Sequence, residues 1–255
     1  MRFPLVALLP LALTACVTAD PFSQEVRRYF AETDMLAAHY TRLYTSDGGI
    51  VNHGRMQKWH RDASPKLDAG YERGVPHGSW SEWYEGGQIS VKGEYQHGQR
   101  HGAWRTWDPE GTLRSSMSYE DGRLQGAFSL WDVEGRPLVE GSYVRDHRNG
   151  EWSLYHENGT KRLAGRYERG HPEGRWSAWY ADGALAGEGG YRLGLRNGLW
   201  VCWDAEGTRL ARSRFAEDSA ASPSPLAAGV WPTEGMPVKD PFDFAAELSD
   251  PALPK

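Results

Sequence analysis

Three things are scarce in this chain: cysteine, long apolar runs and net positive charge. Among its 255 residues, only Cys16 and Cys202 are cysteines. Beyond one apolar run near the N-terminus, no segment is apolar enough to cross a bilayer as a helix. Lys and Arg number 29 and Asp and Glu number 34, so a formal charge of −5 provides no basic surface for nucleic acid. A nucleic-acid partner and a membrane-spanning helix are therefore not expected.

The first residues have the layout of a secretory signal peptide. Arg2 precedes an apolar run over residues 3–13, which is too short to span a membrane, and small residues lead into Cys16. The residues Leu-Thr-Ala-Cys at 13–16 also resemble the bacterial lipobox, whose cysteine is diacylated and becomes the first residue of the mature chain. We expect residues 1–15 to be a signal peptide and Cys16 to carry lipid. An ordinary signal peptide with an incidental cysteine is the alternative.

Lipidation of Cys16 would anchor the protein. Two or three acyl chains, at roughly 0.8 kcal/mol per buried methylene, hold a protein stably on a membrane. Val17, by resemblance to sorting rules in diderm bacteria, points to the outer membrane. We therefore expect a bacterial cell-envelope protein, lipid-anchored at the periplasmic face of the outer membrane. Cys202 is then left without a disulfide partner and is interpreted as a small buried side chain rather than a catalytic thiol.

Glycine and aromatic residues are abundant, and they recur with a period of 24 residues. The marker of each copy, here called the repeat glycine, is Gly54, Gly78, Gly102, Gly126, Gly150, Gly174 and Gly198. Two residues later stands the first aromatic row, which is Met56, Trp80, Trp104, Phe128, Trp152, Trp176 and Trp200. Three residues further on stands the second aromatic row, which is Trp59, Trp83, Trp107, Trp131, Tyr155, Trp179 and Trp203. The tyrosine row, 17 residues after each repeat glycine, is Tyr71, Tyr95, Tyr119, Tyr143, Tyr167, Tyr191 and Phe215.

Each copy contains two strand-like runs of about six residues separated by turn residues. One turn is Gly-Gly, Glu-Gly, Asn-Gly or Asp-Gly, and the other lies near the end of the copy, as in residues 97–101. Glycine recurs too often for a helix, and no helical period survives across the turns. The sequence thus predicts an all-β fold, a single elongated antiparallel meander of hairpins with about seven 24-residue repeats over residues 54–217.

The spacing also predicts the register of the hairpins. With a four-residue loop at 85–88, Tyr84 would oppose Ile89 and Trp80 would oppose Gly93. One face then carries the first aromatic row, the tyrosine row and strand glycines such as Gly93, and it is the predicted core. The opposite face is largely polar and carries the second aromatic row. A one-residue bulge would move that row inward, an alternative that the sequence leaves open.

Residues 93–104, which read Gly-Glu-Tyr-Gln-His-Gly-Gln-Arg-His-Gly-Ala-Trp, resemble the MORN (membrane occupation and recognition nexus) repeat, and its bacterial variant most of all. The pairs of tryptophans, and Asp146 in place of a turn glycine, depart from the eukaryotic pattern. The resemblance implies an elongated sheet that serves as a scaffold, a membrane-proximal binding surface or a dimerisation module. Many bacterial relatives are labelled antitoxins of toxin–antitoxin pairs, a role that an exported lipoprotein fits poorly.

The segments that flank the repeats differ in pattern. Within the N-terminal segment 16–53, Ser23 can cap a helix, and a stripe of apolar residues between Pro21 and Thr45 predicts a helix that covers the end of the sheet. Docking of this helix on a partner or on the membrane surface is the alternative. Pro, Ala and Ser dominate residues 218–255, which we expect to be mostly disordered.

No arrangement of residues typical of an enzyme is found in the sequence. His53, His77 and His101 share one position of the repeat, but equivalent residues of successive copies lie about 9–10 Å apart, too far to share one zinc ion. Asp108 and Asp132 also share a position and are interpreted as polar strand ends rather than catalytic acids. We therefore expect a non-enzymatic protein with no catalytic residue, no metal site and no cofactor.

The second aromatic row is the best candidate for a binding face. Its seven rings would line a largely polar face at intervals of about 10 Å. Flat aromatic rows stack on sugars or receive an extended partner, and Trp and Tyr are enriched at interface hot spots. The alternative is that these rings fill the packing of their own hairpins. We expect an envelope scaffold or protein-interaction module with an unknown protein partner; a carbohydrate-binding protein, with peptidoglycan as the ligand, and an antitoxin or immunity-like protein are the alternatives.

Overall fold

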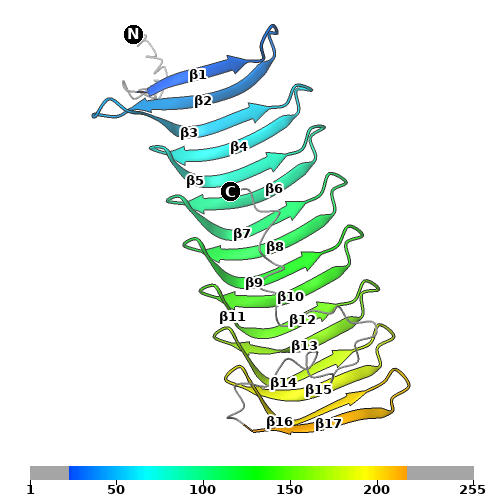
Figure 1. Cartoon of the computed structure of the whole chain (residues 1–255). Helices are drawn as coiled ribbons and strands as arrows, with labels where there is room; N and C mark the ends of the chain where they lie inside the picture. Colours follow the sequence, from blue (N-terminus) through cyan, green and yellow to red (C-terminus); the bar gives the residue numbers. More distant parts are fainter. Residues whose placement is uncertain (1–22, 217–255) are drawn as a thin grey trace, which may run out of the picture.

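The computed structural model describes residues 23–216, which form one antiparallel sheet of 17 strands (Figure 1). The sheet is a single elongated layer in which strands pair with their neighbours along the chain. Residues 23–216 contain no helix, and so none that could span a membrane. The predicted all-β meander of hairpins is confirmed. The predicted signal peptide with Cys16, and the predicted disordered tail, lie outside the described residues.

The strands follow one another at short intervals. They are β1 (Ser23–Tyr29), β2 (Leu36–Tyr44), β3 (Ile50–Trp59), β4 (Pro65–Glu72), β5 (Val75–Trp83), β6 (Ile89–Gln96), β7 (Gln99–Trp107), β8 (Leu113–Glu120), β9 (Arg123–Trp131), β10 (Pro137–Val144), β11 (His147–Arg148), β12 (Gly150–Tyr155), β13 (Lys161–Glu168), β14 (His171–Trp179), β15 (Leu185–Arg192), β16 (Leu195–Trp203) and β17 (Arg209–Phe215). The short β11 and the following β12 both pair with β10. One 24-residue copy corresponds to one hairpin, such as β5 with β6.

Two kinds of turn alternate along the sheet. A five-residue loop joins β5 to β6 and is closed by a hydrogen bond from the Tyr84 N–H to the Gln88 carbonyl (2.8 Å). A two-residue turn at His97 and Gly98 joins β6 to β7, and both residues have positive φ (49° and 81°), as in a type I′ hairpin. The Gly98 N–H also donates to the Pro76 carbonyl (2.8 Å), so the tight turn is bonded to the preceding hairpin. Successive tight turns are therefore stacked along one edge of the sheet.

Asp146, which stands where the other tight turns have glycine, preserves this contact. Its φ is 67°, and its N–H donates to the Leu124 carbonyl (3.0 Å). Its carboxylate also accepts a hydrogen bond from the Leu124 N–H (2.7 Å). Aspartate enters the left-handed region more readily than most residues. The additional hydrogen bond therefore offsets the strain, and the turn persists without glycine.

The repeat glycine introduces a bend into the strand that carries it. All seven repeat glycines have positive φ, which disfavours any side chain with a Cβ and explains why glycine recurs so strictly. The pairing of β6 with β7 passes from Lys92–Arg105 directly to Glu94–His101, so that three residues of β7 face Gly93 alone. Such a bulge bends the strand and increases its twist. The strands accordingly curve in the same sense along the sheet (Figure 1).

The bulge leaves room for the largest side chains of the core. The Trp104 indole lies over Gly93, where a Cβ would come within 2.3 Å of the ring atom Cδ2. Its N–H donates to the Glu94 carbonyl (3.1 Å) next to that glycine. The same arrangement places Trp152 over Gly141, Trp176 over Gly165 and Trp200 over Gly189. The predicted pairing of Trp80 with Gly93 is confirmed, but the ring that covers Gly93 belongs to the next copy of the repeat.

The tyrosine row separates these indoles. Tyr167 contacts Trp152 and Trp176 edge to face, with ring centroids 5.9 and 5.1 Å away. Tyr191 stands in the same relation to Trp176 and Trp200, at 6.1 and 5.0 Å. Each such pair contributes about 0.5–1.5 kcal/mol beyond the burial of its area. Because these three indoles are at most 2% exposed, the predicted core face is confirmed.

Where the strand glycine is replaced, either the type of the ring opposite or the hydrogen bond that the ring makes differs as well. Met117 occupies the equivalent position opposite Phe128, and the smaller phenyl ring stands in place of an indole. Ala69 lies opposite Trp80, whose N–H donates to the Glu82 carboxylate (2.7 Å) rather than to a backbone carbonyl. The ring of each hairpin is thus adapted to the residue that it faces on the preceding hairpin.

The prediction of an N-terminal helix is wrong. Residues 23–44 form a further hairpin, β1 with β2, in which Val26 pairs with Tyr40, and β2 in turn pairs with β3. A helix would leave the backbone groups along the edge of β3 without partners, whereas β2 hydrogen-bonds to them. Ala38 and Tyr40 are buried beside Met56. The periodicity did not reveal this hairpin, because Phe30 stands one period before the first repeat glycine.

The predicted loop length is one residue too short. Trp83, and not Tyr84, pairs with Ile89, and the register shifts by one residue between Glu82 and Trp83. The equivalent hairpins show the same shift. The loop needs five residues because two hydrogen bonds close it, one from the Tyr84 N–H and one from the Gly87 N–H to the Tyr84 carbonyl (3.1 Å). A one-residue bulge next to the five-residue loop, which the sequence left open, is therefore present.

Replacement of Gly165 by alanine tests the contact between indole and glycine. A Cβ there would lie 2.1 Å from the Trp176 Cδ2 atom, so Gly165→Ala should lower the free energy of unfolding by roughly 1–3 kcal/mol through overpacking. Adding Trp176→Phe should relieve part of this strain, so the double variant should be more stable than the sum of the single changes implies. Urea unfolding followed by far-UV circular dichroism measures all four proteins. If the changes in unfolding free energy of the two single variants sum to that of the double variant, the contact between Trp176 and Gly165 is contradicted.

Candidate binding face

The second aromatic row lies on the polar face of the sheet and is half-buried throughout. This holds for Trp59, Trp83, Trp107, Trp131, Tyr155, Trp179 and Trp203. The Tyr155 hydroxyl donates to the Glu140 carboxylate (2.5 Å), and Glu140 pairs with Ser153 across the strands, which places these residues on one face. Trp107 and Trp131 occupy the equivalent position at the ends of β7 and β9. The bulge next to each five-residue loop therefore does not move the second aromatic row into the core. The role of this row in binding stays a prediction.

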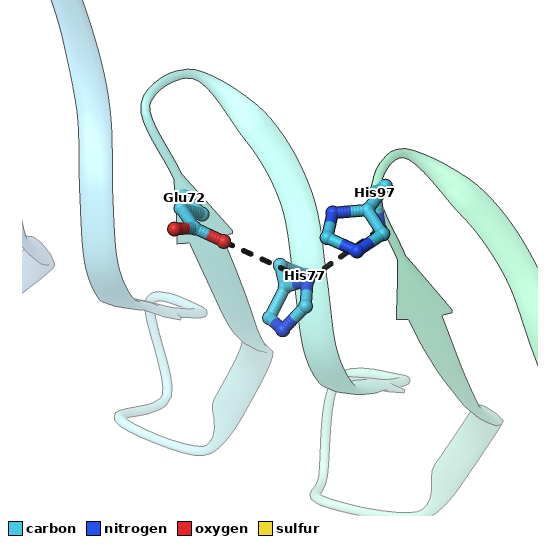
Figure 2. Close-up of side chains that lie close together, drawn as sticks. All are labelled: Glu72, His77 and His97. Carbon is cyan, nitrogen blue, oxygen red and sulfur yellow. Dashed lines mark hydrogen bonds and ion pairs between the residues drawn. The ribbon is translucent and has the colours of Figure 1, made fainter.

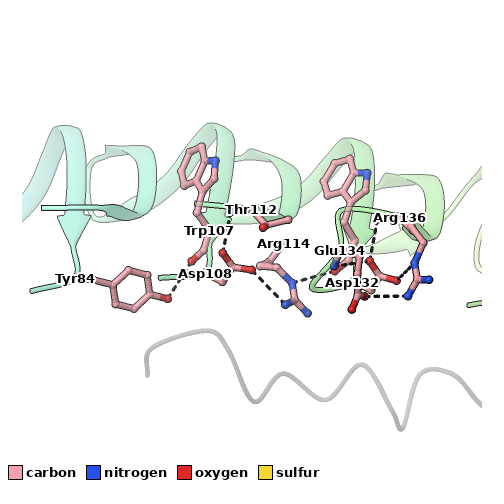
Figure 3. Close-up of polar contacts among 9 residues, drawn as sticks. Tyr84, Trp107, Asp108, Thr112, Arg114, Asp132, Glu134 and Arg136 are labelled. Carbon is pink, nitrogen blue, oxygen red and sulfur yellow. Dashed lines mark hydrogen bonds and ion pairs between the residues drawn. The ribbon is translucent and has the colours of Figure 1, made fainter. Parts of the chain in front are cut away.

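Polar side chains of one hairpin hold the backbone of the second row in the next. The Tyr84 hydroxyl donates to the Trp107 carbonyl (3.0 Å; Figure 3). The Arg114 Nε–H donates to the Trp131 carbonyl (3.1 Å). Equivalent bonds join Tyr180 to the Trp203 carbonyl, His60 to that of Trp83 and His156 to that of Trp179. Neighbouring rings are thus held two strand separations apart, at about 9–10 Å.

Two phenols at this face are neutral hydrogen-bond donors. Burial, together with the hydrogen bond to Glu140 and its charge, raises the pKa of Tyr155 to about 12. Burial also raises the pKa of Tyr180, and the charge of Asp204 adds to the effect. Both phenols therefore remain protonated at neutral pH. At these two positions the face therefore presents neutral phenols beside the rings of the second row.

The aspartates at the strand ends close loops. The Asp108 carboxylate accepts a hydrogen bond from the Thr112 N–H (2.8 Å), and the Asp132 carboxylate accepts one from the Arg136 N–H (2.8 Å). Arg136 also forms an ion pair with Asp132 (2.7 Å; Figure 3). Both carboxylates thus accept hydrogen bonds within the loops that follow β7 and β9.

One group of possible metal ligands was missed by sequence reasoning. The ligand atoms of Glu72, His77 and His97 all lie within 4.8 Å of one another. Comparison of equivalent positions had placed His77 with His53 and His101, one repeat away on either side. His97 instead comes from the tight turn of the following hairpin. Only the stacking of turns could have revealed this approach.

Three segments of the chain match a family model described as the MORN repeat variant, over residues 76–97, 100–121 and 148–168. Each segment corresponds to about one hairpin: β5 with β6, β7 with β8, and β11 and β12 with β13. These matches support the MORN-repeat family. In all three MORN segments, the repeat glycine is followed by a tryptophan of the first row and a ring of the second row.

The chain also resembles solved structures, but only their fold can be compared. No curated protein matches the chain. Among solved structures, the chain is similar to the crystal structure of a protein with unknown function from Bacteroides fragilis. The similarity covers 76% of this chain and 93% of that chain, with 8% sequence identity and a TM-score of 0.11. A TM-score of this size supports no functional argument.

Cys202 should be unreactive in the folded protein. Its side chain is fully buried, and burial raises the pKa of the thiol to about 11, so little thiolate forms near neutral pH. In a Cys16→Ser background, a chromogenic disulfide reagent at pH 8 should therefore modify the thiol only after denaturant is added. Rapid modification of the native protein would contradict the burial of Cys202 in the core.

Proposed function

We propose that this chain is a non-enzymatic, lipid-anchored protein of the bacterial cell envelope, held at the periplasmic face of the outer membrane. MORN repeats suggest a protein-interaction module built from repeats. The rigid sheet would act as a scaffold that presents one long face to a protein partner. The lipobox resemblance at Cys16 supports the anchor.

The single observation that carries the interaction role is the second aromatic row on the polar face. The core is already filled by the first aromatic row and the tyrosine row, so the second row is not needed to complete it. Half-buried Trp and Tyr side chains on a rigid backbone lose little conformational freedom on binding, and these residue types dominate interface hot spots. A partner that contacts several rings must be elongated, because neighbouring rings lie about 9–10 Å apart.

A carbohydrate ligand is the second candidate, with peptidoglycan as the polymer that an envelope protein would meet. Indole faces stack on the apolar faces of sugar rings, and Trp107 and Trp131 occupy equivalent positions on neighbouring hairpins. A polymer with a regular repeat could contact both. The antitoxin or immunity-like role rests on the MORN resemblance alone, and no contact in the sheet favours it.

Replacement of Trp107 and Trp131 by alanine tests the binding face. If they anchor a protein partner, the double variant should bind that partner at least about 30-fold more weakly, the effect expected for loss of a hot spot. The partner is identified by cross-linking in intact envelopes and is then purified, and its affinity is measured by biolayer interferometry. Sedimentation with purified peptidoglycan sacculi tests the carbohydrate alternative in parallel.

Two controls separate binding from folding. Leu193→Ala removes a side chain that is 79% exposed in a tight turn, and it should leave both assays unchanged. Circular dichroism should show that the Trp107→Ala/Trp131→Ala protein retains its sheet. If the double variant loses only its binding to sacculi, the ligand of this face is a glycan and not a protein. Unaltered affinity in both assays would show that the second aromatic row is not the binding face.

Replacement of Cys16 by serine tests the anchor. Without the acylated thioether, the protein should leave the membrane fraction and appear in the soluble periplasmic fraction. Fractionation of cells followed by immunoblotting, with the unmodified chain as reference, measures the change. A Cys16→Ser protein that still sediments with membranes would refute the lipid anchor.

A further inference from the structure

Two histidines and a glutamate meet along the edge where the tight turns stack. Glu72 ends β4, His77 lies near the start of β5, and His97 stands in the turn between β6 and β7 (Figure 2). The Glu72 Oε2 atom lies 3.9 Å from His77 Nδ1, and the centroids of the two imidazole rings are 5.2 Å apart. The ligand atoms of all three residues lie within 4.8 Å of one another.

The fold brings these residues together through the stacking of turns. The Gly98 N–H is bonded to the Pro76 carbonyl (2.8 Å), so the residue before this glycine lies against the residue after Pro76. These two neighbours are His97 and His77. The same geometry recurs at other turns with other side chains in place of this pair: His53 with Arg73, Gln125 with Arg145, and Glu173 with Leu193. Among residues 23–216, this group alone has the composition of a metal site.

The existing contact of His77 is weak enough to be exchanged. Its Nδ1 atom accepts a hydrogen bond from the His97 N–H at 3.4 Å, which is long for a bond of this type. The equivalent bond to Glu173 measures 2.7 Å, and that to Gln125 measures 3.0 Å. A metal ion that took Nδ1 of His77 would therefore displace only a marginal contact.

We infer that Glu72, His77 and His97 form a binding site for a divalent first-row transition-metal ion. Two imidazoles and one carboxylate suit zinc and its neighbours in the series, whereas calcium and magnesium prefer sites made of oxygen alone. Ligands placed about 2.0–2.1 Å from a tetrahedral ion lie roughly 3.3 Å from one another. Because Glu72 and His97 are exposed, rotation of their side chains can close the present spacing.

The site has three protein ligands and therefore a coordination position left over. In zinc sites of this composition the fourth position holds water or an incoming ligand. A side chain of a bound partner could occupy it as readily as water. The site lies along the edge formed by the tight turns and does not include any ring of the second aromatic row. The inference therefore stands independently of the proposed function.

Isothermal titration of the metal-free, untagged protein with zinc chloride tests the inference. We expect one zinc ion per chain, with binding weakened roughly tenfold or more by His77→Asn, by His97→Asn and by Glu72→Gln. Asparagine is suited to both histidine positions. It is the native residue at the equivalents of His77 (Asn149 and Asn197), and it tolerates the positive φ of His97 (49°).

His53→Asn is the matched control. His53 occupies the same position as His77 and accepts the same kind of turn hydrogen bond, from the Arg73 N–H at 3.3 Å, but it has no histidine neighbour in that turn. Its replacement should leave zinc stoichiometry and affinity unchanged. Thermal unfolding without zinc should be the same for all variants, and saturating zinc should raise the Tm of the unmodified protein and of His53→Asn only. Absence of stoichiometric binding, or binding that survives His77→Asn and His97→Asn, would overturn the inference.

Discussion

An indole ring laid over a strand glycine of the preceding hairpin is the contact on which this sheet depends. A single-layer sheet has no second layer on which to bury its apolar face, so its own side chains must cover its backbone. The bulge at each repeat glycine supplies the room, since three residues of one strand face a single glycine of its neighbour. The ring fills that room, its N–H satisfies a nearby carbonyl, and tyrosines fill the gaps between rings. Curvature and core are thus products of the same residues.

The same period that builds the core also arranges the opposite face. Each hairpin adds one ring to the second aromatic row, and the bonds to the backbone carbonyls of Trp107 and Trp131 tie one hairpin to the next. Because each hairpin is bonded to the next in a similar way, the spacing of the rings in that row is nearly constant. This regular spacing therefore restricts the shape of the proposed partner more than its chemical nature. The two edges differ, because the five-residue loops lie along one edge and the stacked tight turns along the other.

The repeat itself could be predicted from the sequence because its rules are local and recur seven times. Turn dipeptides, strict glycines and alternating rings were sufficient for the hairpins, for the pairing of Trp80 with Gly93 and for the core face. The N-terminal hairpin was missed because its spacing departs from the period, and its apolar residues also fit a helical stripe. A one-residue shift at each loop was left open, since a hairpin accommodates either loop length until its closing hydrogen bonds are known.

The sequence by itself determined the fold class, the number of complete repeats and the core face with its first aromatic row and tyrosine row, because alternation and period act within one hairpin. Only the tertiary structure decided which copy supplies the ring above Gly93, since that contact joins two hairpins. It also decided that the second aromatic row is half-buried, and that His97 meets His77 rather than a histidine of equivalent position. Contacts between copies depend on how the hairpins bend and stack, and the bend is a property of the assembled sheet.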